Sequence, residues 1–223
     1  MKIKLAPRLE LISSLVPQGS FVADVGSDHA HLPIALMQRE ISRGAVASDL
    51  RKGPCARALE NIALYGQTGK ISVECTDGLN GIEQYKPDCI VIAGMGAELM
   101  ARILDESPIP KNEKVTLVLQ PMKYAERLRE YFCKSGYMID GEYLVRDGHI
   151  YQIIKAHYTG VPYSLSEAEL WLGKRGARSS PEMFGAFADR QTARLRRIIA
   201  AKEDCDEEKR LLSVLENEIG GEK

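Results

Sequence analysis

Five apolar runs, rich in β-branched residues, recur along the chain at intervals typical of alternating strands and helices. Their near-continuous apolarity predicts strands that are buried on both faces, as in a parallel sheet. The segments between them have helical spacing, so the pattern predicts a doubly wound α/β sheet. The predicted strands are residues 21–25, 44–50, 70–75, 88–93 and 115–120, and two of the predicted helices are residues 54–65 and 122–135.

The segment 137–158 has a different pattern. It predicts two strands joined near Asp147-Gly148, a dipeptide that tolerates the positive φ of a tight hairpin turn. Five parallel strands closed by an antiparallel hairpin resemble the class I, Rossmann-like fold of S-adenosylmethionine-dependent methyltransferases more than that of a nicotinamide dehydrogenase. We therefore expect residues 1–160 to form a methyltransferase domain that binds S-adenosylmethionine.

Residues 161–223 form a second predicted unit. Residues 163–181 have the pattern of a short helix and a loop, and apolar residues recur at helical spacing from 182 to 219. The charged segment 202–209 interrupts them as a turn or a helix extension. We expect a small α-helical, coiled-coil-like domain of two antiparallel helices.

Composition narrows the class of protein. The chain has 223 residues, 44% of them hydrophobic, so it can bury a sizeable core. No apolar run approaches the roughly 20 residues that cross a bilayer, and the first residues do not resemble a signal peptide. Five scattered cysteines without C-x-x-C spacing indicate reduced thiols. We expect a cytoplasmic protein with no membrane partner. Its net charge of −1 leaves nucleic-acid binding to local basic patches.

The first strand runs into "VADVGSDHAHLPIAL", residues 22–36, which has two incompatible interpretations. His29 and His31, with Asp28 beside them, could ligate a metal in a hydrolase. Alternatively, the turn binds a nucleotide-like cofactor, although only Gly26 remains of a G-x-G-x-x-G fingerprint. S-adenosylmethionine carries no phosphate, so fewer glycines suffice, and Asp24 or Asp28 could hold its ammonium group.

The ends of the next two strands favour the cofactor interpretation. Asp49 lies 23 residues beyond Gly26, near the spacing at which an acid bonds ribose hydroxyls. Asp77 follows the third strand, where this fold often places an acid against adenine. Each aspartate alone fits a helix cap or a turn. A metal site would need more ligands, yet only His149 and His157 remain, on the predicted hairpin. We expect no metal.

Several motifs resemble one family. Together with "VADVGSDHAHLPIAL", the chain contains "IAGMGAELM" (92–100), "LVLQP" (117–121) and "LAPRL" (5–9), followed by a helical appendage. This combination resembles the bacterial TrmK family, tRNA methyltransferases that modify N1 of adenine at position 22. Three residues depart from the family pattern: Ala97 stands where a second glycine is usual, Met122 where asparagine is frequent, and His31 where tyrosine is frequent.

The resemblance implies a role for each matching segment. Residues Gly26, Ser27, Asp28, His29 and Ala30 would form the cofactor turn. Asp49-Leu50 would bind the ribose and Asp77-Gly78 the adenine edge, while Ala93-Gly94-Met95-Gly96 would present the target base. Arg8 would contact either the cofactor carboxylate or an RNA phosphate.

The implied chemistry needs little acid–base help. Adenine N1 is uncharged and carries a lone pair, so it attacks the sulfonium methyl group without a strong base, and catalysis is mostly positioning. We expect backbone carbonyls near Gly94 to accept the exocyclic amine hydrogens and Met95 to form an apolar wall. Asp28 would stabilise the developing cation. Simple packing is the alternative role for Met95.

A base inside folded RNA must be extruded before it can react, so binding energy has to come from elsewhere on the tRNA. Arg190, Arg194 and Arg197 share one helical face at i, i+4 and i+7, with Lys174 and Arg175 upstream. Such a stripe could hold phosphates, or it could be a solvated face paired with nearby acids. The competing functions are a small-molecule methyltransferase, a metal-dependent hydrolase, and an RNA-binding module whose catalytic site has decayed.

Overall fold

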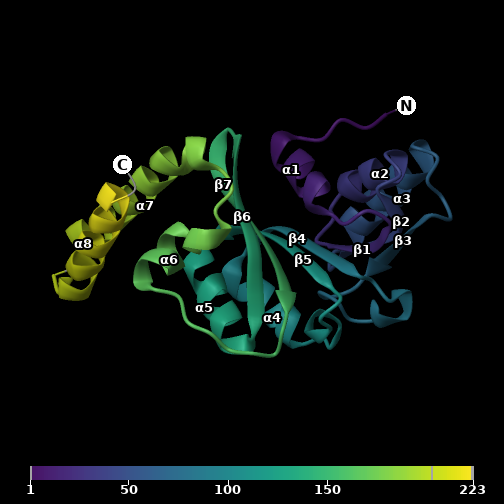
Figure 1. The fold of residues 1–223 in the computed structure, drawn as a ribbon. Coiled ribbons are helices and arrows are strands. Elements are labelled where there is room, and N and C mark those ends of the chain that lie inside the picture. The colour runs from purple at the N-terminus through teal and green to yellow at the C-terminus, as the bar shows by residue number, and fades with distance from the viewer. Residues whose placement is uncertain (1, 202, 222–223) are drawn as a thin grey trace.

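The computed structural model describes residues 2–201 and 203–221 of the chain. Its centre is a seven-stranded sheet in the order β3-β2-β1-β4-β5-β7-β6 (Figure 1). Strands β1 to β5 are parallel, as the apolar runs predicted. The strands are β1 (Ser20–Val25), β2 (Ser42–Asp49), β3 (Ile71–Cys75), β4 (Cys89–Gly96), β5 (Thr116–Lys123), β6 (Tyr137–Asp147) and β7 (His149–Tyr158).

Helices cover both faces of the sheet, which explains why its central strands are apolar on both sides. Ile12 of α1, Leu32 of α2 and Ile62 of α3 lie in one buried cluster. Met100 and Phe132 lie in the other, with α4 and α5. The helices are α1 (Pro7–Leu15), α2 (His31–Gln38), α3 (Lys52–Leu64), α4 (Ala97–Asp105) and α5 (Ala125–Ser135), with short 3-10 turns η1 (Glu83–Tyr85) and η2 (Ile109–Lys111).

The predicted hairpin closes the sheet. Strands β6 and β7 pair antiparallel around a turn at Gly148, whose φ of 71° is in the left-handed region. Strand β7 then pairs antiparallel with β5, with Leu119 opposite Ile154. The prediction of a Rossmann-like methyltransferase sheet with an antiparallel hairpin at its end is therefore confirmed.

Strand order reverses between β1 and β4, because β2 lies on one side of β1 and β4 on the other. Val25 pairs with Ser48 and with Ile92, so the carboxyl ends of the three strands lie at one edge. In open α/β sheets, ligands bind in the crevice outside this reversal point. The edge at the ends of β1, β2 and β4 is thus the expected location of the site.

The C-terminal residues are helical, as predicted: α6 (Glu167–Leu172), η3 (Arg175–Ala177), α7 (Pro181–Ala201) and α8 (Asp206–Gly221). Helices α7 and α8 pack side by side at one end of the molecule (Figure 1). Phe187 and Leu195 of α7 and Leu215 of α8 are buried in one cluster with residues of α6, and Leu144 and Ile150 of the hairpin pack against the same cluster. A domain boundary at residue 160 stays a prediction. No helix in the described part of the chain is long and apolar enough to span a membrane.

Candidate cofactor and substrate site

A cavity of about 300 Å³ lies at the carboxyl ends of the first four strands. Its wall contains predicted residues from each of these ends, together with several that sequence patterns did not single out. The predicted residues on the wall are Gly26, Asp49, Leu50, Asp77, Gly78, Ala93, Gly94 and Met95, and the others include Ser48, Arg51, Thr76, Leu99, Arg102 and Ile103.

Gly26 is the one fingerprint glycine that the first turn keeps, and the structure requires it. Its φ is 74°, a conformation that L residues rarely adopt. Its amide donates to the Ser48 carbonyl at 2.8 Å, which ties the turn to the end of β2. A Cβ at this position would overlap the terminal methyl group of Met95. The first turn and the end of β4 therefore meet here in close contact.

Asp24 lies behind the turn rather than on the cavity wall. Its side chain is buried, and Ser27 Oγ donates to Asp24 Oδ2 at 2.5 Å. Burial raises the pKa of Asp24 to about 6, although the Ser27 hydrogen bond favours the ionised form. A group that is half ionised near pH 6 is sensitive to a nearby cation.

Asp28, His29 and Ala30 also lie outside the cavity wall and tie the turn to α3. Arg57 Nη2 donates to Asp28 Oδ1 at 3.0 Å, and Asn61 donates to the His29 carbonyl at 3.0 Å. Ala30 is fully buried at the start of α2. Because its carboxylate is paired with Arg57, Asp28 is better placed to fix the turn than to stabilise a cation in the cavity.

The rings of His29 and His31 stack with their centroids 5.3 Å apart. Desolvation and the charge of His29 lower the pKa of His31. His157 is on the hairpin and hydrogen-bonds Asp140 at 2.8 Å. Within residues 2–201 and 203–221, no three His, Cys, Asp or Glu side chains gather as metal ligands would. The hydrolase interpretation thus gains no further ligand.

Asp49 and Asp77 face the cavity as expected. Asp49 is largely buried, and its Oδ1 accepts a hydrogen bond of 2.9 Å from the Arg51 amide. Arg102, from α4, donates to both carboxylate oxygens of Asp77, at 3.0 and 3.2 Å. These hydrogen bonds lower the pKa of Asp77 and hold its carboxylate in one orientation. Arg102 is 25 residues away in sequence, so no local pattern reveals this contact.

Arg8 joins the site from α1. Its Nη1 donates to Oε1 of the buried Gln120 at 2.5 Å, and the Gly94 amide donates to the same oxygen at 3.1 Å. The Arg8 guanidinium also lies 5.4 Å from the ring centroid of Tyr151. Gln120 thus links the ends of β4 and β5 to α1, a role that its place in "LVLQP" did not reveal.

Two of the departures from the family pattern can be placed. Ala97 is the first residue of α4, and its φ is not in the left-handed region, so alanine fits where glycine is usual. The Sδ atom of Met122 accepts a hydrogen bond of 3.6 Å from Gln120 Nε2. A thioether is a weak acceptor, so this contact is softer than an amide partner would provide.

A second cleft, of about 330 Å³, lies between the end of β5, the hairpin and α7. Arg190, Arg194 and Arg197 lie together on one wall of this cleft, as their helical spacing predicted. They face residues 121–126 and 149–152. Lys174 and Arg175 lie elsewhere: Lys174 Nζ donates to the Ile139 carbonyl at 3.1 Å, and Arg175 pairs with Glu218 at 2.5 Å. The structure therefore separates the two groups of predicted RNA-binding residues.

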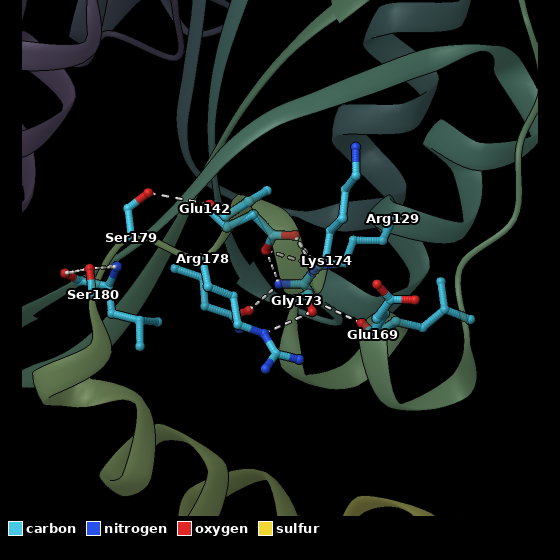
Figure 2. A network of polar contacts seen from close by, with 12 residues as sticks. Arg129, Glu142, Glu169, Gly173, Lys174, Arg178, Ser179 and Ser180 are labelled. Atoms are coloured by element: carbon cyan, nitrogen blue, oxygen red, sulfur yellow. Dashed lines mark hydrogen bonds and ion pairs between the residues drawn. The ribbon is translucent and has the colours of Figure 1, made fainter. Parts of the chain in front are cut away.

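A buried ion pair anchors the helical appendage to the sheet (Figure 2). Arg129 of α5 and Glu142 of β6 lie 2.5 Å apart, with side chains only 1% and 7% exposed. Arg129 also donates to the Leu170 carbonyl at 2.7 Å, and Glu142 accepts from the Lys174 amide at 2.8 Å. The pair therefore fixes the segment that leads into α7.

A parallel sheet closed by an antiparallel hairpin, with carboxylates around a cavity at the strand ends, is the arrangement expected of a Rossmann-like methyltransferase. A family model described as a methyltransferase domain matches residues 5–154. A tRNA (adenine(22)-N(1))-methyltransferase of Bacillus subtilis is 36% identical over 156 residues, which span 70% of this chain and just under two thirds (66%) of that relative.

Solved structures extend the likeness to nearly the whole chain. A Streptococcus pneumoniae protein proposed to be a tRNA (m1A22) methyltransferase, in complex with S-adenosyl-L-methionine, matches with a TM-score of 0.83 and 31% identity, covering 94% of this chain and 97% of that one. The Bacillus subtilis m1A22 tRNA methyltransferase TrmK matches with a TM-score of 0.79 and 28% identity, covering 98% and 97%. The chain belongs to the family of tRNA (adenine(22)-N1)-methyltransferases.

Proposed function

We propose that this protein transfers a methyl group from S-adenosylmethionine to N1 of adenine 22 in tRNA. We also propose that it acts in the cytoplasm. The family carries this proposal, and the cavity at the strand ends supports it. The cofactor supplies an electrophilic methyl group on a sulfonium. The chain has to bind that cofactor, present the base and exclude water.

The cavity wall has the donors and surfaces that such a cofactor needs. We assign the ribose hydroxyls to Asp49, because its carboxylate lies at the cavity and is fixed by the Arg51 amide. The apolar side chains of Leu50, Leu99 and Ile103 lie around the cavity and would sandwich the adenine, with Asp77 at its edge. Leu50 is 67% exposed, and burial against a bound ring would give this side chain a function.

The end of β4 is proposed as the place where the target base meets the cofactor. Gly94 is exposed with a φ of 82°, and its amide is held by Gln120, so its backbone is fixed yet open to a ligand. The side chain of Met95 extends from this end against Gly26. Such a position suits an apolar wall that keeps water from the reacting atoms.

The reaction places small demands on the chain. Positive charge moves from the sulfonium to the base, so the net charge of the site is unchanged, and no proton has to leave N1 before attack. No general base is needed, and the contribution of the site is alignment, which can supply roughly 7–11 kcal/mol. Electrostatic help from Asp28 is not part of the proposal, because Arg57 already pairs with its carboxylate.

Asp49→Ala tests the proposal. Loss of a charge-assisted hydrogen bond, worth roughly 1.5–3 kcal/mol, should raise the KM for S-adenosylmethionine about 10- to 100-fold. Nucleoside mass spectrometry on unmodified tRNA would measure 1-methyladenosine formation. Lys114→Ala is the control, because Lys114 is exposed and precedes β5, at the opposite edge of the sheet. Two outcomes would contradict the proposal: methylation of a tRNA that carries guanine at position 22, or the absence of methylation in every tRNA tested.

A further inference from the structure

Tyr124 has an unusual backbone for its residue type. It lies between β5 and α5 with a φ of 59°, in the left-handed region where an aromatic residue costs about 1–2 kcal/mol. Its side chain is nevertheless 43% exposed and belongs to no buried cluster. Burial in an apolar cluster therefore does not explain why tyrosine occupies this position, and such strain tends to cluster at functional sites.

The Tyr124 ring is held by two cations. The guanidinium carbons of Arg127 and Arg194 lie 4.8 and 5.1 Å from its centroid. Arg127 also pairs with Glu98, and Arg194 pairs with Glu126 at 2.6 Å and lies 4.7 Å from the Trp171 ring centroid. These partners fix the two arginines in place, and the contacts of the arginines with the ring orient it.

Tyr124 faces the second cleft, which adjoins the proposed reaction site. Strands β4 and β5 are neighbours, with Met95 opposite Pro121 and Gly96 opposite Lys123. The end of β4, at the proposed reaction site, therefore lies beside the end of β5, which leads to Tyr124. Across the cleft, Arg190 and Arg197 are exposed on α7. An aromatic surface on one wall and cations on the other complement a base and its phosphate.

We propose that the exposed part of the Tyr124 ring, which Arg127 and Arg194 contact, is a stacking platform for an unpaired nucleobase next to the target adenine, and that Arg190 and Arg197 bind the phosphates of that nucleotide. The proposal rests on the tRNA methyltransferase function. It assigns Tyr124 to substrate positioning: stacking keeps the neighbouring nucleotide out of the RNA helix and holds the extruded adenine at the end of β4. Aromatic faces accept every base, so the platform adds affinity without reading sequence.

Two substitutions separate this role from a structural one. Tyr124→Gly removes the ring and the backbone strain together, because glycine adopts a positive φ readily. We expect the KM for tRNA to rise roughly 5- to 150-fold, the loss of one base–aromatic stack. The Kd for S-adenosylmethionine should stay unchanged, and the melting temperature should not fall. Tyr124→Phe keeps the ring and should retain the wild-type KM.

The matched control is Lys86→Gly. Lys86 also has a left-handed backbone, with a φ of 49°, but it precedes β4 at the opposite edge of the sheet, so its substitution should leave the KM for tRNA unchanged. An unchanged KM in Tyr124→Gly, or an equal loss of thermal stability and activity, would overturn the platform while the methyltransferase function stands. Absence of tRNA methylation by the wild-type protein would instead overturn the proposed function, and the platform with it.

Discussion

Asp24 illustrates how much a single buried carboxylate can cost. Its pKa is about 6 in the folded protein, against an ordinary value of 3.8. A raised pKa means that burial disfavours the ionised form, so the folded state is most stable below about pH 4 with respect to this group. That stability is lost as the pH rises through 6, and the shift of about two units corresponds to roughly 3 kcal/mol.

We therefore predict that Asp24→Asn stabilises the cofactor-free protein at neutral pH. The amide keeps an acceptor for Ser27 Oγ but has no charge to bury. The melting temperature of the variant, measured against pH, should exceed that of the wild type by an amount that grows between about pH 4 and 6 and then levels off. A constant difference across this range would show that the Asp24 carboxylate does not titrate as described.

At the scale of elements, the chain is held together where α5, β6 and the segment after α6 meet. Arg129 and Glu142 are buried there, pair with each other, and satisfy one backbone group of α6 and one of the segment after it. A buried pair of this kind is weak evidence for net stability, but removal of one partner leaves an uncompensated buried charge. The orientation of α7, and with it the arginine wall of the second cleft, depends on this contact.

Glu142→Gln should accordingly destabilise the protein by about 3–5 kcal/mol in chemical denaturation. Glu130→Gln is the comparison, since Glu130 pairs with Lys134 on the exposed face of α5, the helix that carries Arg129. An exposed pair is worth about 0–1 kcal/mol, so that variant should unfold close to the wild type. Similar midpoints for the two variants would argue against the anchoring role of the buried pair.

At the scale of the whole molecule, the tRNA would lie across both the sheet and the appendage, and the arginines of α7 divide into two kinds. Arg190 and Arg197 are exposed toward the cleft, whereas Arg194 is paired with Glu126 and packed between rings. Phosphate contacts release counterions, so each one steepens the salt dependence of binding.

We predict that Arg190→Ala and Arg197→Ala each reduce the slope of log Kd against log salt concentration by about 0.7–0.9. Arg194→Ala should change this slope less and lower the melting temperature more, because its charge is already neutralised. Titration of tRNA at several salt concentrations would measure the slopes. Equal slopes in the wild type and in Arg190→Ala and Arg197→Ala would place the phosphate contacts on another surface.

The sequence alone determined the architecture of this protein. Near-continuous apolar runs, instead of the alternation of a half-buried strand, indicated the parallel sheet, and the Asp147-Gly148 turn indicated the hairpin, because both depend on local chemistry. Asp49, Asp77 and Gly94 could be assigned to one edge for the same reason: the carboxyl ends of parallel strands always meet. The motifs around residues 22–36 and 92–100 then indicated the family.

Only the tertiary structure decided which side chains meet across the fold. Asp28 faces α3 and Arg57 instead of the cavity, since the conformation of a turn between β1 and α2 is set by its packing partners. Gln120, Arg102 and Tyr124 gained their roles from contacts with Arg8, Asp77 and Arg194, each far away in the sequence. Sequence periodicity reports the face on which a residue lies, but the partner on the facing element is fixed only when the chain has folded.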